Sequence, residues 1–155
     1  MTSSPAWLIE CDDSLTIAVG EHEMTEYIQE QECYPVPGSP EHCSRVLVWQ
    51  DNIVPVMDIG TLNGGAGEQV KPFLCVLAYQ QEPMAPLQHL ALRVSSPPQR
   101  IQVEDEQACE FPDELISSVL RPVALSCFLH EQQPVIVVDI ARLCSAEFRD
   151  LATAA

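Results

Sequence analysis

Residues 46–59 read Val-Leu-Val-Trp-Gln-Asp-Asn-Ile-Val-Pro-Val-Met-Asp-Ile, and residues 127–140 read Cys-Phe-Leu-His-Glu-Gln-Gln-Pro-Val-Ile-Val-Val-Asp-Ile. Each stretch is an apolar run, three polar residues and a second apolar run that closes on Asp-Ile-x-x-Leu. The two stretches keep one offset, because 139 − 58 = 81 for the aspartates and 143 − 62 = 81 for the leucines. A three-residue polar break between two β-branched runs predicts a β-hairpin in each stretch.

The ends of these stretches favour a duplication. The second run is apolar at nearly every position, so both of its faces should be buried. Asp58 and Asp139 follow the run and are placed to cap a turn or a short helix. Chance resemblance between two Val-rich strands is the alternative, since the repeat covers little of the chain. We favour duplication, and hence two similar half-barrels, because the loop length, the Asp and the Leu all keep register.

Length and charge limit the class of protein. The chain has 155 residues, enough for one domain, residues 1–155, with a sizeable core. Seven Lys and Arg face 23 Asp and Glu, for a formal net charge of −16. Such a charge argues against nucleic acid and anionic membranes as partners. It fits a basic protein partner or simply solubility. No run is long enough to insert in a membrane, and residues 1–5 show no signal peptide, so we expect a cytoplasmic protein.

The cysteines and histidines do not form a recognisable chemical site. None of the seven cysteines forms a Cys-x-x-Cys pair, and reduced thiols are expected: Cys11, Cys33, Cys43, Cys75, Cys109, Cys127 and Cys144. Cys75, Cys127 and Cys144 lie in apolar runs and should be small buried hydrophobes. Zinc could be held only by scattered candidates that lack paired short spacings: His22, Glu23, Cys33, His42 and Cys43. We therefore predict neither a metal site nor a cofactor.

Catalytic arrangements are also not supported by the pattern. Cys127 and His130 share one predicted strand, and their spacing directs them to opposite faces. Asp58 and Asp139 are better explained as caps in two subdomains than as a carboxylate pair. The Gly-rich residues 63–67 lack the Lys-Ser/Thr of a phosphate-binding loop and should be a flexible linker. The sequence therefore predicts no catalytic residues and no enzyme.

The rest of the chain reads as short strands with brief helices. Strands are expected at residues 6–11, 15–19, 73–79, 87–94 and 100–103. Residues 21–32 could be a helix by composition or a strand by alternation, and both remain open. Short helices are expected after Ser39, as N-cap, and over residues 113–120. A terminal helix is expected over residues 141–153. This order implies a barrel or a sandwich.

Three segments carry a resemblance to a known family: Val36-Pro37-Gly38-Ser39-Pro40, Val46-Leu47-Val48-Trp49 and Ile53-Val54-Pro55-Val56-Met57-Asp58-Ile59. Together they resemble the CheW family of bacterial chemotaxis adaptors, and the likeness extends over residues 6–144. The resemblance implies a mainly β fold of two small five-stranded β-barrel subdomains with short helices and a C-terminal helix. The approximate subdomains are residues 15–70 and 71–144, with the strand at 6–11 and the helix at 141–153 packing on them.

The resemblance also implies partners and an interface. Family members bridge chemoreceptor cytoplasmic tips to the regulatory domain of a CheA-type histidine kinase, without catalysis. The interface residues expected here are Met24, Glu26, Trp49, Gln50, Asp51 and Asn52. Trp49 is either an exposed interface anchor or part of the core between the barrels. The chain has Gln50-Asp51 where the family has Arg-Gly, so we expect weaker docking to an ordinary receptor tip.

We therefore predict a non-enzymatic adaptor for chemotaxis or for type IV pilus-linked chemosensory signalling. One alternative is a ligand-binding sensory module with a cleft between its halves. Another is an accessory adaptor that has lost receptor docking and sequesters a partner.

Overall fold

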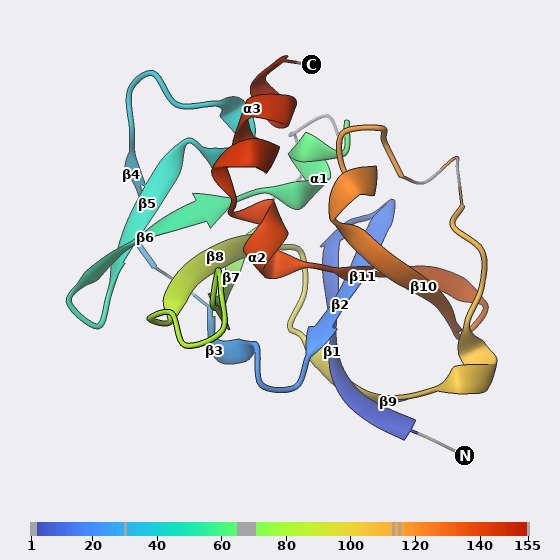
Figure 1. Ribbon diagram of the computed structural model, residues 1–155. Coiled ribbons are helices and arrows are strands. Elements are labelled where there is room, and N and C mark those ends of the chain that lie inside the picture. The colour runs from blue at the N-terminus through green and yellow to red at the C-terminus, as the bar shows by residue number, and fades with distance from the viewer. Residues whose placement is uncertain (1–2, 30, 65–70, 113, 115, 155) are drawn as a thin grey trace.

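The computed structural model describes residues 3–29, 31–64, 71–112, 114 and 116–154. In this part of the chain the strands form two curled sheets (Figure 1). One sheet has five strands in the order β10-β11-β2-β1-β9. Its strands are β1 (Ser3–Asp12), β2 (Leu15–Gly20), β9 (Gln99–Glu104), β10 (Ala124–His130) and β11 (Gln133–Val138).

The other sheet has six strands in the order β3-β7-β8-β6-β5-β4. Its strands are β3 (Met24–Ile28), β4 (Tyr34–Pro35), β5 (Arg45–Trp49), β6 (Asn52–Met57), β7 (Phe73–Tyr79) and β8 (Gln88–Val94). The mainly β, two-barrel architecture is therefore confirmed, although β4 adds a sixth strand to one sheet.

The strands of the two sheets do not come from the expected subdomain ranges 15–70 and 71–144. The five-stranded sheet combines β1 and β2 with β9, β10 and β11, whereas the six-stranded sheet runs from β3 to β8. Two parallel pairings join strands from different expected subdomains. They are β6 with β8 at Val56↔Ala91 and β11 with β2 at Val137↔Ala18. Val56 and Val137 are related by the same offset, since 137 − 56 = 81.

Both repeated stretches form the expected hairpins, β5–β6 and β10–β11. Each turn has two residues at positive φ, namely Gln50 (47°) and Asp51 (64°) in the first and Glu131 (50°) and Gln132 (68°) in the second. Positive φ at both central positions is the type I′ turn, whose twist matches that of the strands. The third polar residue of each break already belongs to the next strand.

The predicted caps are confirmed, and the duplication reaches beyond the hairpins. Helix α1 (Ile59–Leu62) is capped by Asp58, whose Oδ1 accepts from the Thr61 backbone N–H at 3.1 Å. Helix α2 (Ile140–Leu143) is capped by Asp139 in the same way, from Arg142 at 3.2 Å. A 3-10 turn also precedes each hairpin, η1 (Glu41–Cys43) before β5 and η3 (Arg121–Val123) before β10.

The backbone of each cap is held by an equivalent carbonyl in those turns. The Asp58 N–H donates to the His42 carbonyl at 2.7 Å, and the Asp139 N–H donates to the Val123 carbonyl at 2.8 Å. These acceptors are also related by 123 − 42 = 81. Two hydrogen bonds in register outside the matched sequence favour duplication over chance.

The structure decides one open assignment, at residues 21–32, and corrects the expected helix cap at Ser39. Residues 24–28 are the edge strand β3, so the strand reading of this segment holds. Ser39 does not cap η1: Pro40 precedes it without a side-chain bond, and the Ser39 hydroxyl donates to the Val36 carbonyl at 2.5 Å. The predicted flexible loop at residues 63–67 lies mostly outside the described residues.

The two predicted helices near the C-terminus also differ from expectation. Of the segment 113–120, the described residues form turns and bends rather than a helix, and 113 and 115 lie outside them. The expected helix over 141–153 is two helices, α2 and α3 (Ala146–Ala154). They separate at Ser145, whose Oγ accepts from the Phe148 N–H at 3.1 Å and so starts the second helix.

Three apolar clusters hold the described structure together. One draws only on the six-stranded sheet and includes Leu47, Trp49 and Leu74. A second draws only on the five-stranded sheet and includes Ile101 and Phe128. The third and largest takes residues from both sheets and from the helices, so it joins the two halves.

Candidate functional surface

Trp49 lies inside the six-stranded sheet and not on its surface. Its side chain is only 7% exposed and packs in the cluster of that sheet. The ring of His89 on β8 lies 4.7 Å away, centroid to centroid. Both expectations for Trp49 are therefore wrong, since it is neither an exposed anchor nor part of the core that joins the sheets. The alternation of β5 explains this, because Leu47 and Trp49 share the inward face.

The indole of Trp49 is bound by a predicted site residue on another strand. Its Nε1 donates a hydrogen bond of 2.5 Å to Glu26 Oε2. Glu26 lies on β3, at one end of the sheet, whereas β5 is separated from the other end only by the two-residue β4. This charge-assisted bond therefore connects the two ends of the curled sheet.

An open polar hollow lies where these two ends approach each other. It is lined by residues 26–29 and Gln31 on the β3 side and by residues 48–50 on the β5 side. The structure thus brings Glu26, Trp49 and Gln50 together. Met24 is not part of this group, because it is half-buried and packs against the cluster that joins the sheets.

The tip of the first hairpin is exposed and ordered by its own contacts. Gln50, Asp51 and Asn52 are all exposed. The Asn52 side-chain amide donates to the Gln50 carbonyl at 3.1 Å, which bridges the turn. The three predicted tip residues are therefore available to a partner.

Next to the tip lies an apolar pair that sequence analysis did not single out. Val48 on β5 and Ile53 on β6 are directly opposite each other, and they are 51% and 74% exposed. The signal was present in the alternation of β5, where Val48 lies between two inward residues. We define the hairpin surface as Glu26, Val48, Gln50, Asp51, Asn52 and Ile53.

The second hairpin repeats part of this surface. Leu129 is exposed and lies opposite Pro134. These positions correspond to Val48 and Ile53, since 129 − 48 = 81 and 134 − 53 = 81. The duplicated hairpins therefore both direct apolar side chains outward beside the turn.

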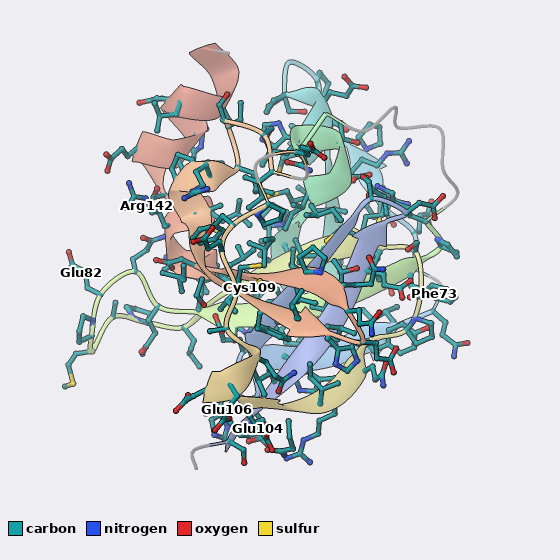
Figure 2. The ribbon with its side chains drawn as sticks, turned by 90° about the vertical axis from the view of Figure 1, so that its right-hand side faces the viewer. Phe73, Glu82, Glu104, Glu106, Cys109 and Arg142 are labelled. Carbon is teal, nitrogen blue, oxygen red and sulfur yellow. The ribbon has the colours of Figure 1, made fainter. Side chains whose placement is uncertain are left out.

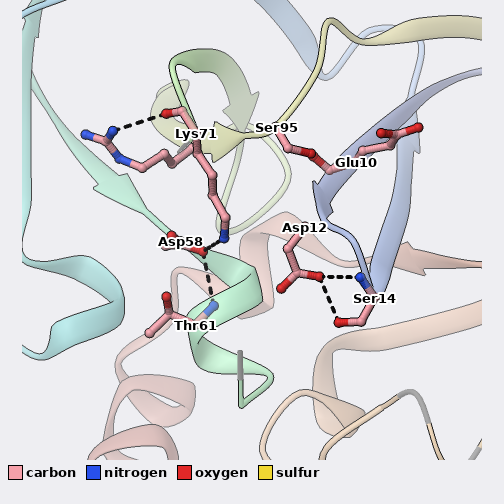
Figure 3. Close-up of polar contacts among 8 residues, drawn as sticks. Glu10, Asp12, Ser14, Asp58, Thr61, Lys71 and Ser95 are labelled. Carbon is pink, nitrogen blue, oxygen red and sulfur yellow. Dashed lines mark hydrogen bonds and ion pairs between the residues drawn. The ribbon is translucent and has the colours of Figure 1, made fainter. Parts of the chain in front are cut away.

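Charged side chains are rarely buried in proteins unless they are paired, and Lys71 is buried here. Its Nζ lies 2.6 Å from Asp58 Oδ1, and the two side chains are 4% and 19% exposed (Figure 3). The same Asp58 oxygen caps α1, and the Arg93 guanidinium donates to the Lys71 carbonyl at 3.2 Å. A Cβ at Gly60 would collide with the Asp12 carboxylate and the Lys71 ammonium. This buried ion pair fixes the junction of β6 with α1, and no sequence motif indicated it.

The residues considered as metal ligands do not come together in the structure. Glu23 Oε1 accepts from the Gly20 N–H at 2.7 Å, and burial raises the pKa of its carboxyl. Burial lowers the pKa of His42. Within the described ranges, no three His, Cys, Asp or Glu side chains group as metal ligands would. No helix described here is long and apolar enough to cross a membrane.

The cysteines predicted as buried hydrophobes largely match. Cys75 and Cys127 are buried, and Cys144 is half-buried. Burial raises the pKa of each of these three thiols to about 12. They therefore remain protonated at neutral pH, as small apolar side chains do in a core.

The structure is a module of two curled sheets that carries an exposed apolar pair beside the turn of one hairpin. A family model described as a CheW-like domain matches residues 6–148, so the chain belongs to the CheW family. A solved structure of the scaffolding protein TtCheW from Thermoanaerobacter tengcongensis has a TM-score of 0.70 at 11% identity. That match covers 89% of this chain and 90% of the other. A comparison with curated proteins gave no match. The CheW-like scaffold fold supports a chemotaxis adaptor role in general.

Proposed function

We propose that this protein is a non-enzymatic adaptor that couples chemoreceptors to the regulatory domain of a CheA-type histidine kinase. Membership of the CheW family supports the adaptor class. The observation that carries the proposal is the exposed Val48–Ile53 pair on a hairpin that the Trp49–Glu26 bond holds beside its turn. An exposed apolar pair on a rigid element can form the apolar core of a protein interface.

The charge around this pair indicates what the partner surface should look like. Glu26 lines the same hollow as Val48, Asp51 lies in the adjoining turn, and the chain carries a net charge of −16. A complementary partner would offer an apolar patch bordered by Lys or Arg, which would speed association and exclude acidic competitors. We propose that the kinase regulatory domain supplies this patch and that both proteins meet in the cytoplasm.

Receptor docking is proposed to be weak because of the tip. Gln50 lacks the five donors of an Arg side chain, and Asp51 adds a negative charge. Replacing Gln50-Asp51 by Arg-Gly should strengthen binding to an ordinary chemoreceptor tip. The replacement fits the backbone, because glycine accepts the positive φ of position 51. Unchanged affinity would mean that receptors do not contact this tip.

Reconstitution tests the coupling function itself. Receptor-containing membranes and the CheA-type kinase of the same cell are mixed with and without this protein, and kinase autophosphorylation is followed. The adaptor should make kinase activity depend on the receptor, and the Arg-Gly variant should do so at lower protein concentration. If the kinase responds to receptors equally well without the protein, the proposed coupling role is wrong.

The pathway is also a proposal. The altered tip favours an accessory array, such as one linked to type IV pili, over the main flagellar array. Deletion of the gene should then reduce surface motility by pili and leave swimming chemotaxis unchanged. The reverse phenotype would assign the protein to flagellar chemotaxis.

A ligand-binding sensory role is the second candidate, and one cavity favours it. A space of about 270 Å³ lies beside α3 and is lined mainly by Met57, Leu90, Leu143 and Phe148, with His42 and Arg149 at its wall. A ligand that binds only the native state must raise its apparent stability. A thermal-shift screen of small amphipathic compounds at saturating concentration tests this role, which fails if no compound raises the melting temperature.

A further inference from the structure

Cys109, in the segment that follows β9, contacts Cys127 on β10. Cys109 Sγ lies 2.8 Å from Cys127 Sγ, which is a direct thiol–thiol contact. The Cys109 N–H donates to the Cys127 carbonyl at 3.0 Å, and Ala108 forms a β-bridge with Phe128. Figure 2 shows Cys109 beside the β10–β11 hairpin. The two residues are therefore directly opposite each other in an antiparallel pairing.

This backbone arrangement suits a disulfide. Opposite residues of a hydrogen-bonded antiparallel pair have Cα atoms about 5.5 Å apart. Disulfides usually span Cα distances of about 4.4–6.8 Å. The Gln107 side-chain amide also donates to the Leu129 carbonyl at 2.9 Å, which holds the segment against β10. A bond between the two sulfurs thus requires little movement of the chain.

The two thiols differ in exposure, which sets the order of reaction. Cys109 is half-buried, whereas Cys127 is buried. Burial and the adjacent Cys109 side chain raise the pKa of Cys127 to about 12. Since the thiolate is the nucleophile, the more accessible Cys109 should meet an oxidant first and Cys127 should react second.

We propose that Cys109 and Cys127 form a redox-active dithiol that a peroxide converts into an intramolecular disulfide. Cys109 attacks one peroxide oxygen, the O–O bond breaks, and sulfenic acid and water form. Cys127 then attacks the sulfenic sulfur, its proton leaves with the hydroxide as a second water, and the S–S bond forms. Two thiols are oxidised and one hydrogen peroxide is reduced to two waters.

The bond would lock a defined part of the molecule. Strand β9 leads through η2 (Asp105–Gln107) to Cys109, and β10 is the edge strand at the opposite end of the same sheet. The disulfide would therefore join the two ends of the five-stranded sheet covalently. Closing a loop of 18 residues restricts the unfolded chain, which should raise the melting temperature by about 5–10 °C.

Peptide mapping after peroxide treatment tests the inference on the full chain. Cleavage after glutamate separates the two cysteines, because Glu106 and Glu110 border one of them and Glu114 and Glu131 border the other. Hydrogen peroxide at low molar excess should give a linked peptide pair that dithiothreitol separates. Oxidised protein should also melt at the higher temperature, and the reductant should reverse this shift.

Two variants make the result specific. Cys109→Ser should abolish the linked peptide and the melting shift, whereas Cys33→Ser, at another half-buried cysteine, should keep both. The inference is overturned if Cys109 stops at sulfinic acid, if it links to another cysteine, or if peroxide leaves both thiols reduced. Peptide mapping of the peroxide-treated wild-type protein tests the inference even if Cys109→Ser folds poorly. None of these outcomes depends on the proposed adaptor role.

Discussion

Trp49 and Glu26 connect the two ends of the six-stranded sheet, because the indole Nε1 donates to Glu26 Oε2 at 2.5 Å across strands that are not neighbours. A buried donor that loses its acceptor costs about 1–3 kcal/mol. Glu26→Ala should therefore lower the free energy of unfolding by about 1–3 kcal/mol in urea titrations. Glu26 is exposed, so no cavity contributes to this loss.

Glu26→Gln is the matched control for that change. The amide oxygen can still accept from the indole, so this variant should lose less stability than Glu26→Ala. Equal stability of the wild type and Glu26→Ala would show that the bond does not hold the sheet ends together.

The two capping aspartates should differ in importance. Asp58→Ala removes a cap and also leaves the buried Lys71 ammonium without its carboxylate, which should cost about 3–5 kcal/mol. Asp139→Ala removes a cap at the equivalent position and should cost about 1 kcal/mol. Urea denaturation of both variants measures the difference.

A double variant separates the ion pair from the cap. In a Lys71→Met background, Asp58→Ala should cost only about 1 kcal/mol, because no buried ammonium is left unpaired. If Asp58→Ala is as mild as Asp139→Ala in the wild-type background, the ion pair contributes nothing to stability.

The duplicated turns predict a pair of stabilising substitutions. Asp51 and Gln132 both hold positive φ, which costs a residue with a Cβ about 1–2 kcal/mol. Glycine removes that strain but adds about 0.5–1 kcal/mol of backbone entropy to the unfolded chain. Asp51→Gly and Gln132→Gly should each raise the free energy of unfolding by about 0.5–1 kcal/mol. Gln133→Gly, within β11, should lower it, and a fall for all three would contradict the turn type.

Glu23 should make stability depend on pH. Burial raises the pKa of its carboxyl in the folded state, so the folded protein binds this proton more tightly than the unfolded chain. Its contribution is therefore favourable at low pH and is lost as the pH rises through the raised pKa. Glu23→Gln should be more stable than the wild type at pH 7, by less than about 1 kcal/mol because solvent screens the half-exposed group.

The sign is checked by lowering the pH. The advantage of Glu23→Gln in thermal or urea unfolding should shrink as the pH falls through the raised pKa. A Glu23→Gln variant that gains stability relative to wild type as the pH falls would contradict the assignment.

The sequence predicted well whatever depends on local pattern. The polar breaks located both hairpins, and the constant offset located Asp58 and Asp139 as caps. The turn type was hidden, because Gln-Asp and Glu-Gln are not the Asn-Gly or Asp-Gly pairs that normally indicate it. The long-range strand pairing could not be predicted either, because no local sequence pattern indicates that β2 pairs with β11.

The candidate surface was predicted only in part for the same reason. Composition of residues 21–32 favoured a helix as much as a strand, and pairing of β3 with β7 decides for the strand. Gln50 and Asp51 were correctly expected to be exposed. The inward position of Trp49 follows from the alternation of β5, but its bond to Glu26 depends on the curl of the sheet, which no short motif indicates. Val48 and Ile53 became visible as a surface pair only once their register was known.

Calorimetric titration of the purified protein with the isolated regulatory domain of the CheA-type kinase from the same cell tests the central claim most directly. The wild type should bind with micromolar affinity or better, and Ile53→Ser should bind at least about tenfold more weakly because it removes a central apolar contact. Leu87→Ser, at another exposed apolar residue, should bind as the wild type does. Absence of wild-type binding, or equal binding by Ile53→Ser, would contradict the account.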